Sequence, residues 1–199
     1  CTQLRATAKW RTKNVAAIRT KMMGGNYKPC DWPNVDKVAR FAVILLTDGP
    51  TRKNHSLILA STQRIYEPKP FMKAISNEDF FQINLHILEY ALLRSDRLSA
   101  ERGELVGTSM VYDAADMTVH HVTFAVLMRF KPCVPLADLY YPELLMTMQV
   151  LNAAPYITTV WNLIRPLLSA DLQARVSIHD VNHSVKAIAN TADPQYIPT

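Results

Sequence analysis

The chain contains 199 residues, of which 49% are hydrophobic and 20% charged, with only five glycines. This balance is typical of one globular domain with at most a small addition, and it excludes collagen-like, low-complexity and wholly disordered proteins. No apolar run approaches the roughly 18 residues of a membrane-spanning helix, which excludes an integral membrane protein. Three scattered cysteines indicate a reducing compartment, and the lack of an initiator Met and of a signal-peptide pattern predicts a piece of a longer polypeptide.

The net charge of +5 is unevenly distributed along the chain. Residues 1–53 hold eleven Lys or Arg against three Asp, whereas the remainder is net negative. Such a basic segment steers a protein toward lipid headgroups, nucleic acid or an acidic partner, although a solvated helix with its acidic complement elsewhere fits equally well. Nucleic acid is the weakest of these partners, because no aromatic residues alternate with the charges and no zinc-finger spacing occurs. We therefore expect no nucleic-acid binding.

The apolar periodicity predicts strands that alternate with helices along the chain. A first helix ends at Gly24-Gly25, and Ser76 and Asp79 cap the start of a long amphipathic helix. This alternation predicts an α/β fold with a largely parallel sheet. The expected helices are Leu4–Met22, Asn77–Ser95, Val119–Phe130, Ile157–Leu168 and Val181–Ala189. The expected strands are Phe41–Leu46, Ser56–Ala60, Leu105–Tyr112, Met146–Leu151 and Val176–Ile178.

The patterns that often carry catalysis or metal binding are incomplete in this sequence. Ser109 lacks the second glycine of a nucleophile elbow and stands in an apolar run, which predicts a strand residue. His179 and His183 are four residues apart but lack the glutamate of a zinc-binding HExxH motif. Asp113 and Asp116 follow a strand end, where a catalytic and a helix-capping role are both open. Gly-rich nucleotide loops are also absent. Because all of these patterns are incomplete or absent, we expect no enzyme and no metal site.

The segment Ile157–Leu168 is the most distinctive in the chain because it is apolar on nearly all sides. It follows Ala153-Ala154-Pro155-Tyr156 and contains Trp161. Composition alone favours a buried core helix. The alternative is a lid that exchanges between the protein and a membrane, with Tyr156 and Trp161 suited to the membrane interface.

Several motifs resemble the CRAL-TRIO lipid-binding domain family. The family pattern is YPE, an apolar strand, N-x-P, and an apolar helix ending in K-P-F-L. The corresponding residues here are Tyr140-Tyr141-Pro142-Glu143, the strand Met146–Leu151, Asn152-Ala153-Ala154-Pro155, Val160-Trp161 and Arg165-Pro166-Leu167-Leu168. Further agreement is found at Lys9-Trp10-Arg11, Ile65-Tyr66-Glu67-Pro68, Tyr112-Asp113 and Tyr196-Ile197-Pro198. The resemblance spans nearly the whole chain and is most specific from Tyr140 to Leu168.

The sequence departs from the family pattern at several places. Asn54-His55-Ser56 replaces a G-R-P turn, an extra Ala separates Asn152 from Pro155, and Arg165 replaces a Lys. The family's E-Y-G-G ending and most of its small N-terminal helical domain are missing. We therefore divide the chain into a remnant of the N-terminal helical region, residues 1–35, and a CRAL-TRIO-like lipid-binding domain, residues 36–199.

The resemblance implies an α/β fold whose mostly parallel or mixed sheet is packed with helices around an apolar lipid cavity, closed by a gate helix. It implies a bound lipid in place of a cofactor, contact with anionic membranes, and a cytoplasmic, peripheral membrane location. The residues expected at the cavity and gate are Tyr156, Ile157, Val160, Trp161, Ile164, Leu167 and Leu168. Arg165, Ser184 and Lys186 are expected to meet a phospholipid or phosphoinositide headgroup, and Arg5, Lys9, Arg11 and Lys13 to face the membrane.

Two classes of function stay open on the sequence alone. The first is the transfer or presentation of a hydrophobic ligand or phospholipid between membranes. The second is a non-transferring lipid-sensing or targeting module, joined to other domains of a larger signalling or membrane-contact protein. The apolar composition does not identify the ligand, which leaves phospholipid, sterol, retinoid and tocopherol open.

Overall fold

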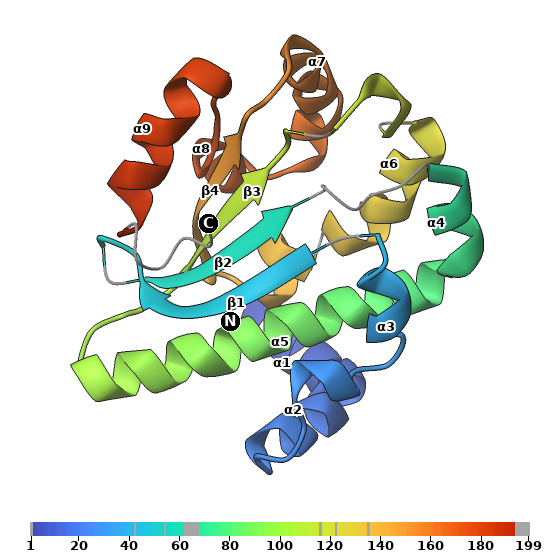
Figure 1. The fold of residues 1–199 in the computed structure, drawn as a ribbon. Helices are drawn as coiled ribbons and strands as arrows, with labels where there is room; N and C mark the ends of the chain where they lie inside the picture. Colours follow the sequence, from blue (N-terminus) through green and yellow to red (C-terminus); the bar gives the residue numbers. More distant parts are fainter. Residues whose placement is uncertain are drawn as a thin grey trace.

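The computed structural model describes residues 2–41, 43–53, 55–61, 68–115, 117–121, 123–134 and 136–193. A five-stranded sheet forms its centre, with helices on both faces (Figure 1). The strands are β1 (Val43–Pro50), β2 (Ser56–Ser61), β3 (Thr108–Asp113), β4 (Leu145–Leu151) and β5 (Val176–Ile178). The α-helices are α1 (Thr2–Asn14), α2 (Ala16–Met23), α3 (Val35–Val38), α4 (Pro68–Ala74), α5 (Asn77–Arg102), α6 (Phe124–Phe130), α7 (Pro155–Ile164), α8 (Ala170–Ala174) and α9 (Val181–Thr191). The shorter helical turns are η1 (Pro29–Asp31), η2 (Val119–His121), η3 (Lys131–Cys133), η4 (Leu136–Tyr140) and η5 (Arg165–Leu167).

The sheet is mixed, with its strands in the order β1-β2-β3-β4-β5. β1 and β2 are antiparallel, whereas β2, β3, β4 and β5 pair in parallel. A parallel pair needs a crossover between its strands, and helical segments supply each of these crossovers. The α/β fold with a mostly parallel sheet is therefore confirmed. All five predicted strands are present, β5 with the predicted ends and the other four with shifted ends.

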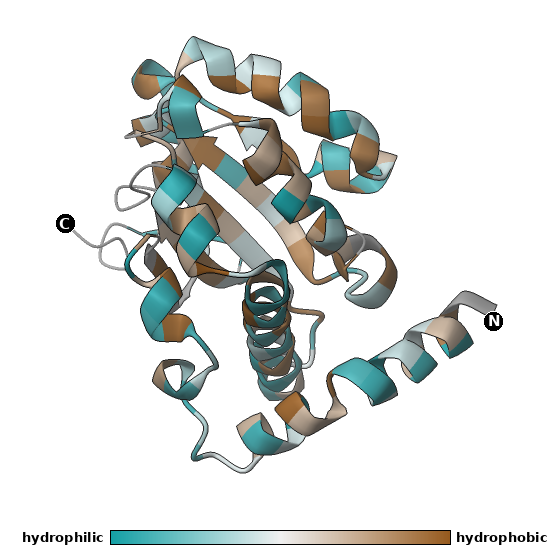
Figure 2. Cartoon of the chain, turned by 90° about the vertical axis from the view of Figure 1, so that its right-hand side faces the viewer, coloured by the Kyte–Doolittle hydropathy of each residue, from teal (hydrophilic) through white to brown (hydrophobic). Residues whose placement is uncertain are grey.

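The two faces of the sheet contact different helices. Ile58 of β2 packs with Leu85 of α5, and its register partners on β3 and β4 lie on the same face. Leu57 points the other way and packs with Ile188 of α9, because successive side chains of a strand alternate. We call these the α5 face and the α9 face. Figure 2 shows hydrophobic residues, drawn in brown, along the strands and on the flanking helices.

The predicted N-terminal helix is divided into α1 and α2. The break is at Val15, whose φ of −124° and ψ of −9° leave the helical range. Val15 and Ile18 are both buried in the cluster that contains Leu85, so the bend keeps both side chains directed at α5. Sequence periodicity does not encode such a bend, because tertiary packing produces it. The proposed division of the chain after residue 35 stays a prediction.

Other helix ends differ from the predicted ones for local reasons. α5 extends to Arg102 and stops at Gly103, whose φ of 69° suits a glycine at the end of a helix. The predicted helix Val119–Phe130 is replaced by η2 and α6, because the Thr123 hydroxyl accepts from the Val126 amide and starts a new helix there. The part of the chain that the structure describes contains no helix long and apolar enough to cross a membrane. Asn54, Ile65-Tyr66-Glu67, Asp116 and Tyr196-Ile197-Pro198 lie outside the described residues.

Candidate functional site

The residues considered for catalysis or metal binding have structural partners. Ser109 is 2% exposed within β3, and its hydroxyl accepts a hydrogen bond from Thr147 at 3.0 Å. His183 pairs with Asp180 at 2.8 Å, at the start of α9. Asp113 accepts from the Ala115 amide at 3.0 Å and from the Asn152 side chain at 2.9 Å, and neither donor is in the first turn of a helix, so both of its alternatives stay predictions. Among the described residues no group of three or more metal-ligating side chains occurs.

A strained turn fixes the point at which α7 leaves the sheet. Asn152 follows β4 with a φ of 53°, in the left-handed region that asparagine tolerates better than most residues. Its amide N–H donates to the Ser184 hydroxyl at 2.7 Å, and its side chain donates to Asp113 at 2.9 Å. Pro155 then occupies the first turn of α7, where its missing N–H costs no hydrogen bond. The N-A-A-P motif therefore directs α7 across the α5 face.

The inner side of α7 is apolar. Ile157 is 7% exposed and packs with Val150 of β4. Val160, Trp161 and Ile164 follow at helical spacing and are partly buried. We call these four residues the inner row. Beside them, the Tyr156 hydroxyl donates to the carbonyl of Met117, and burial raises the pKa of this tyrosine.

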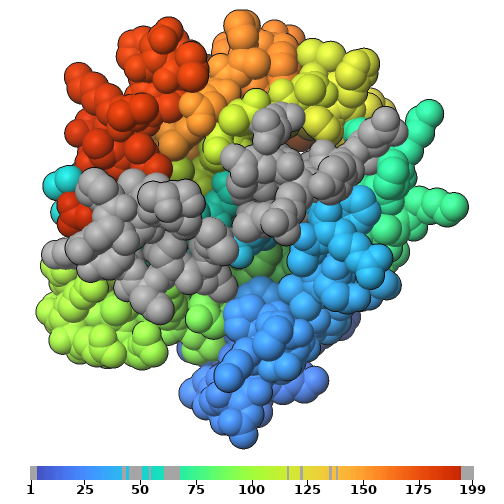
Figure 3. Space-filling model, viewed as in Figure 1, coloured from blue at the N-terminus to red at the C-terminus, as the bar shows by residue number. Residues whose placement is uncertain are grey.

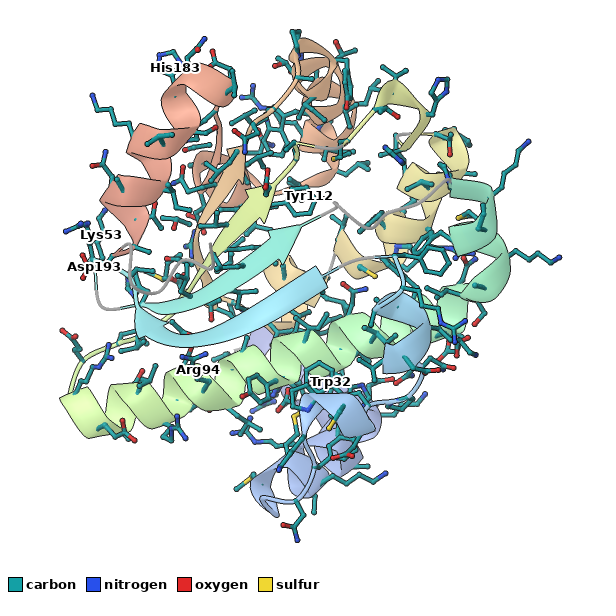
Figure 4. The ribbon with its side chains drawn as sticks, viewed as in Figure 1. Trp32, Lys53, Arg94, Tyr112, His183 and Asp193 are labelled. Carbon is teal, nitrogen blue, oxygen red and sulfur yellow. The ribbon has the colours of Figure 1, made fainter. Side chains whose placement is uncertain are left out.

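An apolar layer of strand side chains lies on the α5 face of the sheet. Its members alternate with α9-facing residues and are only partly buried. Tyr112 lies near the carboxyl end of β3, on the side of α7 (Figure 4). We call this layer the apolar floor, which consists of Met110, Tyr112, Met148, Val176 and Ile178. A hollow of about 300 Å³ in the described part of the chain is lined by other residues, on the α9 face.

The outer side of α7 differs from the sequence prediction. The helix is amphipathic, because Thr158, Thr159 and Asn162 are exposed on that side. Val160 and Trp161, two of the residues expected at the cavity and gate, lie in the inner row, whereas the lid alternative had Trp161 at the membrane interface. The outer apolar surface is confined to the C-terminal end, where Leu163 is 64% and Leu167 of η5 is 51% exposed. Leu168 is partly buried.

The three predicted headgroup residues do not form one site. Arg165 is exposed at the end of α7, where its Nε donates to the Gln173 side chain at 2.7 Å. Ser184 is 4% exposed. Its hydroxyl accepts a hydrogen bond from the Asn152 amide and donates one to the Asp180 carbonyl at 2.6 Å, so this hydroxyl is already used within the protein. Lys186 is exposed on α9, the helix that packs on the opposite face of the sheet from α7. Only Arg165 adjoins the proposed gate.

Arg11 has a structural role instead of the predicted membrane-facing one. Its guanidinium contacts Glu89 of α5 at 2.8 Å, and Glu89 is completely buried. Arg19 at 3.1 Å and the Tyr141 hydroxyl at 3.0 Å complete the partners of this carboxylate. Burial is the main cause that raises the pKa of Tyr141, and the neighbouring Glu89 charge adds to it. A buried carboxylate on α5 requires such partners, so an acid among the apolar residues of this amphipathic helix was the signal available in the sequence.

The other predicted membrane-facing residues, Arg5, Lys9 and Lys13, form an exposed row along α1. α1 is held near η4, where the Thr7 hydroxyl donates to the Leu139 carbonyl at 2.8 Å. η4 precedes β4, whereas α7 follows it, so the row and the gate helix adjoin opposite ends of that strand. In Figure 3 the N-terminal helices (blue) form the lower end of the molecule, and the α7 region (orange) lies at the top.

Comparisons with known proteins agree with this architecture. The model of the CRAL/TRIO domain family matches residues 40–199. No curated protein sequence matches at the significance threshold of the search. A solved structure titled "Crystal structure of Sfh5" is similar in fold, with a TM-score of 0.62 and 13% sequence identity, and the match covers 82% of this chain. The chain spans 61% of the length of that structure.

Proposed function

The chain belongs to the CRAL/TRIO domain family, and from this premise we propose that it binds a hydrophobic ligand or phospholipid and transfers or presents it between membranes. Lipid binding is the general activity of this family. The observation that carries the proposal for this chain is the apolar floor, most of which packs in one cluster with Ile157 of the inner row. We further propose that the binding needs no metal or organic cofactor and that the protein acts at the cytoplasmic surface of membranes.

Burial of hydrocarbon supplies the driving force for binding. An acyl chain gains roughly 0.8 kcal/mol for each CH₂ group removed from water, so a carrier must enclose most of the chain. The apolar floor and the inner row provide two apolar walls for this purpose. Because Ile157 already packs on Val150, α7 must move outward to admit a lipid. Asn152 is braced by two hydrogen bonds, whereas the opposite end of α7 is exposed, so we place the pivot at Asn152.

The exposed end of α7 is suited to docking on a membrane. Leu163 and Leu167 present apolar side chains there, and Arg165 stands between them in sequence. Apolar anchors flanked by a cation favour the boundary between headgroups and acyl chains. Insertion of these leucines would stabilise the outward position of α7 and open the route between the floor and the membrane.

The test combines detection of a bound lipid with measurement of its transfer. We expect native mass spectrometry of the purified protein to show a lipid adduct, and a fluorescent phospholipid to move between vesicles in its presence. Leu163→Asp should slow transfer about tenfold or more while leaving the adduct, because a charged residue opposes insertion. The control is Val185→Asp on α9, which alters a similarly exposed valine and should leave both unchanged.

Each outcome distinguishes among the functions considered. Absence of an adduct together with failure to take up any added lipid would contradict lipid binding. Binding without transfer, under conditions where the protein associates with vesicles, would favour the sensing or targeting module. If Leu163→Asp and Val185→Asp slow transfer equally, the result would contradict the proposal that α7 docks on the membrane.

A further inference from the structure

A hollow lies on the α9 face of the sheet, opposite the apolar floor. It has a volume of about 300 Å³. Side chains of β3, β4 and β5 form its base, and the C-terminal part of α9 and the segment after β1 form its rim. The described residues that line it are Thr51, Lys53, Ser109, Thr147, Gln149, Ser177, His179, Ala187, Asn190 and Thr191. It therefore shares no residue with the lipid site proposed above.

The base of this hollow carries hydrogen-bond donors on three adjacent strands. Ser109 accepts from Thr147, so the hydrogen of its own hydroxyl stays available. The Gln149 side-chain oxygen bonds to His179 Nε2 at 2.6 Å, which leaves the Gln149 amide group available to donate. Ser177, opposite Gln149 in the register, has no side-chain hydrogen bond to another described residue. A sheet face is usually covered by apolar side chains. Hydrogen-bond donors gathered on this one therefore favour a polar ligand in the hollow.

The charge around the hollow favours an anion. Lys53 is exposed at the rim and forms no ion pair with the described residues. No carboxylate is present among the described lining residues. Asp193, which is labelled beside Lys53 in Figure 4, pairs with Arg52 at 3.0 Å, so a cation already compensates its charge. A phosphate group offers several acceptor oxygens to such a set of donors and to the Lys53 ammonium.

We propose that this hollow binds a phosphate monoester carried on a small polyol, with glycerol phosphate as the simplest example. The hydroxyl and amide groups of Ser109, Gln149 and Ser177 match the oxygens of the polyol and phosphate, and Lys53 contributes the opposite charge. The volume lies at the lower end of the range for small-molecule sites. The same chemistry occurs in a soluble metabolite and in the headgroup of phosphatidic acid, so the experiment must separate these two sources.

Titration calorimetry with glycerol phosphate tests the site directly. The wild-type protein should bind it, and Lys53→Gln and Gln149→Leu should each weaken binding about tenfold, the loss expected for one charge-assisted or buried hydrogen bond. Lys73→Gln is the matched control, since Lys73 is an exposed lysine of α4, which lies on the opposite side of the molecule from α9 (Figure 1), and this variant should bind as the wild type does. A parallel series uses phosphatidylcholine vesicles with and without phosphatidic acid. Binding of the vesicle-borne phosphate alone, with the same dependence on Lys53 and Gln149, would assign the site to the lipid source.

Two results would overturn the assignment. One is the absence of binding to both glycerol phosphate and phosphatidic acid vesicles. The other is an equal loss in Lys53→Gln and Lys73→Gln, which would indicate general charge attraction instead of a built site. Because Leu163→Asp tests the lipid proposal on the other face of the sheet, failure of one proposal is distinguishable from failure of the other.

Discussion

The role expected of Arg11 from the sequence differs from the contact that it makes in the structure. By charge alone, Arg11 is one of many cations in the first 53 residues and does not differ from Arg5, yet it pairs with a completely buried carboxylate. We expect Arg11→Ala to lower the free energy of unfolding by about 2–4 kcal/mol, because loss of one partner leaves Glu89 with a poorly compensated buried charge. Arg5→Ala, at an exposed position of the same helix, should change it by less than about 0.5 kcal/mol. Urea unfolding of the two variants measures the difference, and equal stabilities would contradict the role given to Arg11.

Contact of Arg165 with a phospholipid headgroup stays a prediction. Its hydrogen-bond partner Gln173 is neutral, and no carboxylate lies within ion-pairing distance among the described residues. Arg165→Ala should therefore weaken binding of an anionic phospholipid about tenfold and leave a neutral hydrophobic ligand nearly unaffected. Competition between the two ligand types against a fluorescent lipid provides the measurement. Equal losses for both would identify Arg165 as a structural residue.

Helices could be predicted from the sequence where their signals are local. The Ser76 and Asp79 cap of α5 is present, with the Asp79 amide donating to the Ser76 hydroxyl at 3.0 Å. The break at Val15 could not be predicted, because it depends on how α1 and α2 pack on α5. The inward side of α7 was not assigned from the sequence, although Thr158, Thr159 and Asn162 are polar residues that mark its outer side.

The start of α9 gives a pH-dependent prediction for an element. Hydrogen bonds from the His183 side chain and from backbone amides lower the pKa of Asp180. A carboxyl whose folded pKa is depressed stabilises the fold above its unfolded pKa, and this contribution is lost as the pH falls through the folded value. We expect thermal stability to decrease on acidification below about pH 4, near the unfolded pKa of an aspartate. Asp180→Asn, which still caps the helix, should reduce this decrease; an unchanged pH profile would contradict the role of Asp180.

At the scale of the whole molecule, the family motifs were sufficient for the fold but not for the arrangement of its surfaces. Asn152 and Pro155 lie in a recognisable motif and mark the start of α7. The separation of Arg165 from Lys186 was not predictable, because it depends on which face of the sheet each helix covers. The polar hollow on the α9 face was missed for a similar reason. Ser109, Gln149 and Ser177 are distant in sequence and become neighbours only through strand register.

This arrangement changes the expected role of the basic row on α1. β4, with seven residues, separates the α1 side from the α7 side by about 20 Å, which exceeds the Debye length of about 8 Å at physiological ionic strength. If α7 docks on the membrane, Arg5, Lys9 and Lys13 attract it only when little salt is present. Replacing all three by Gln should therefore slow transfer from anionic vesicles at low salt and leave it unchanged at physiological salt. A loss of equal size at both salt concentrations would show that the membrane contacts α1 directly, which would restore the original prediction and remove α7 from the docking surface.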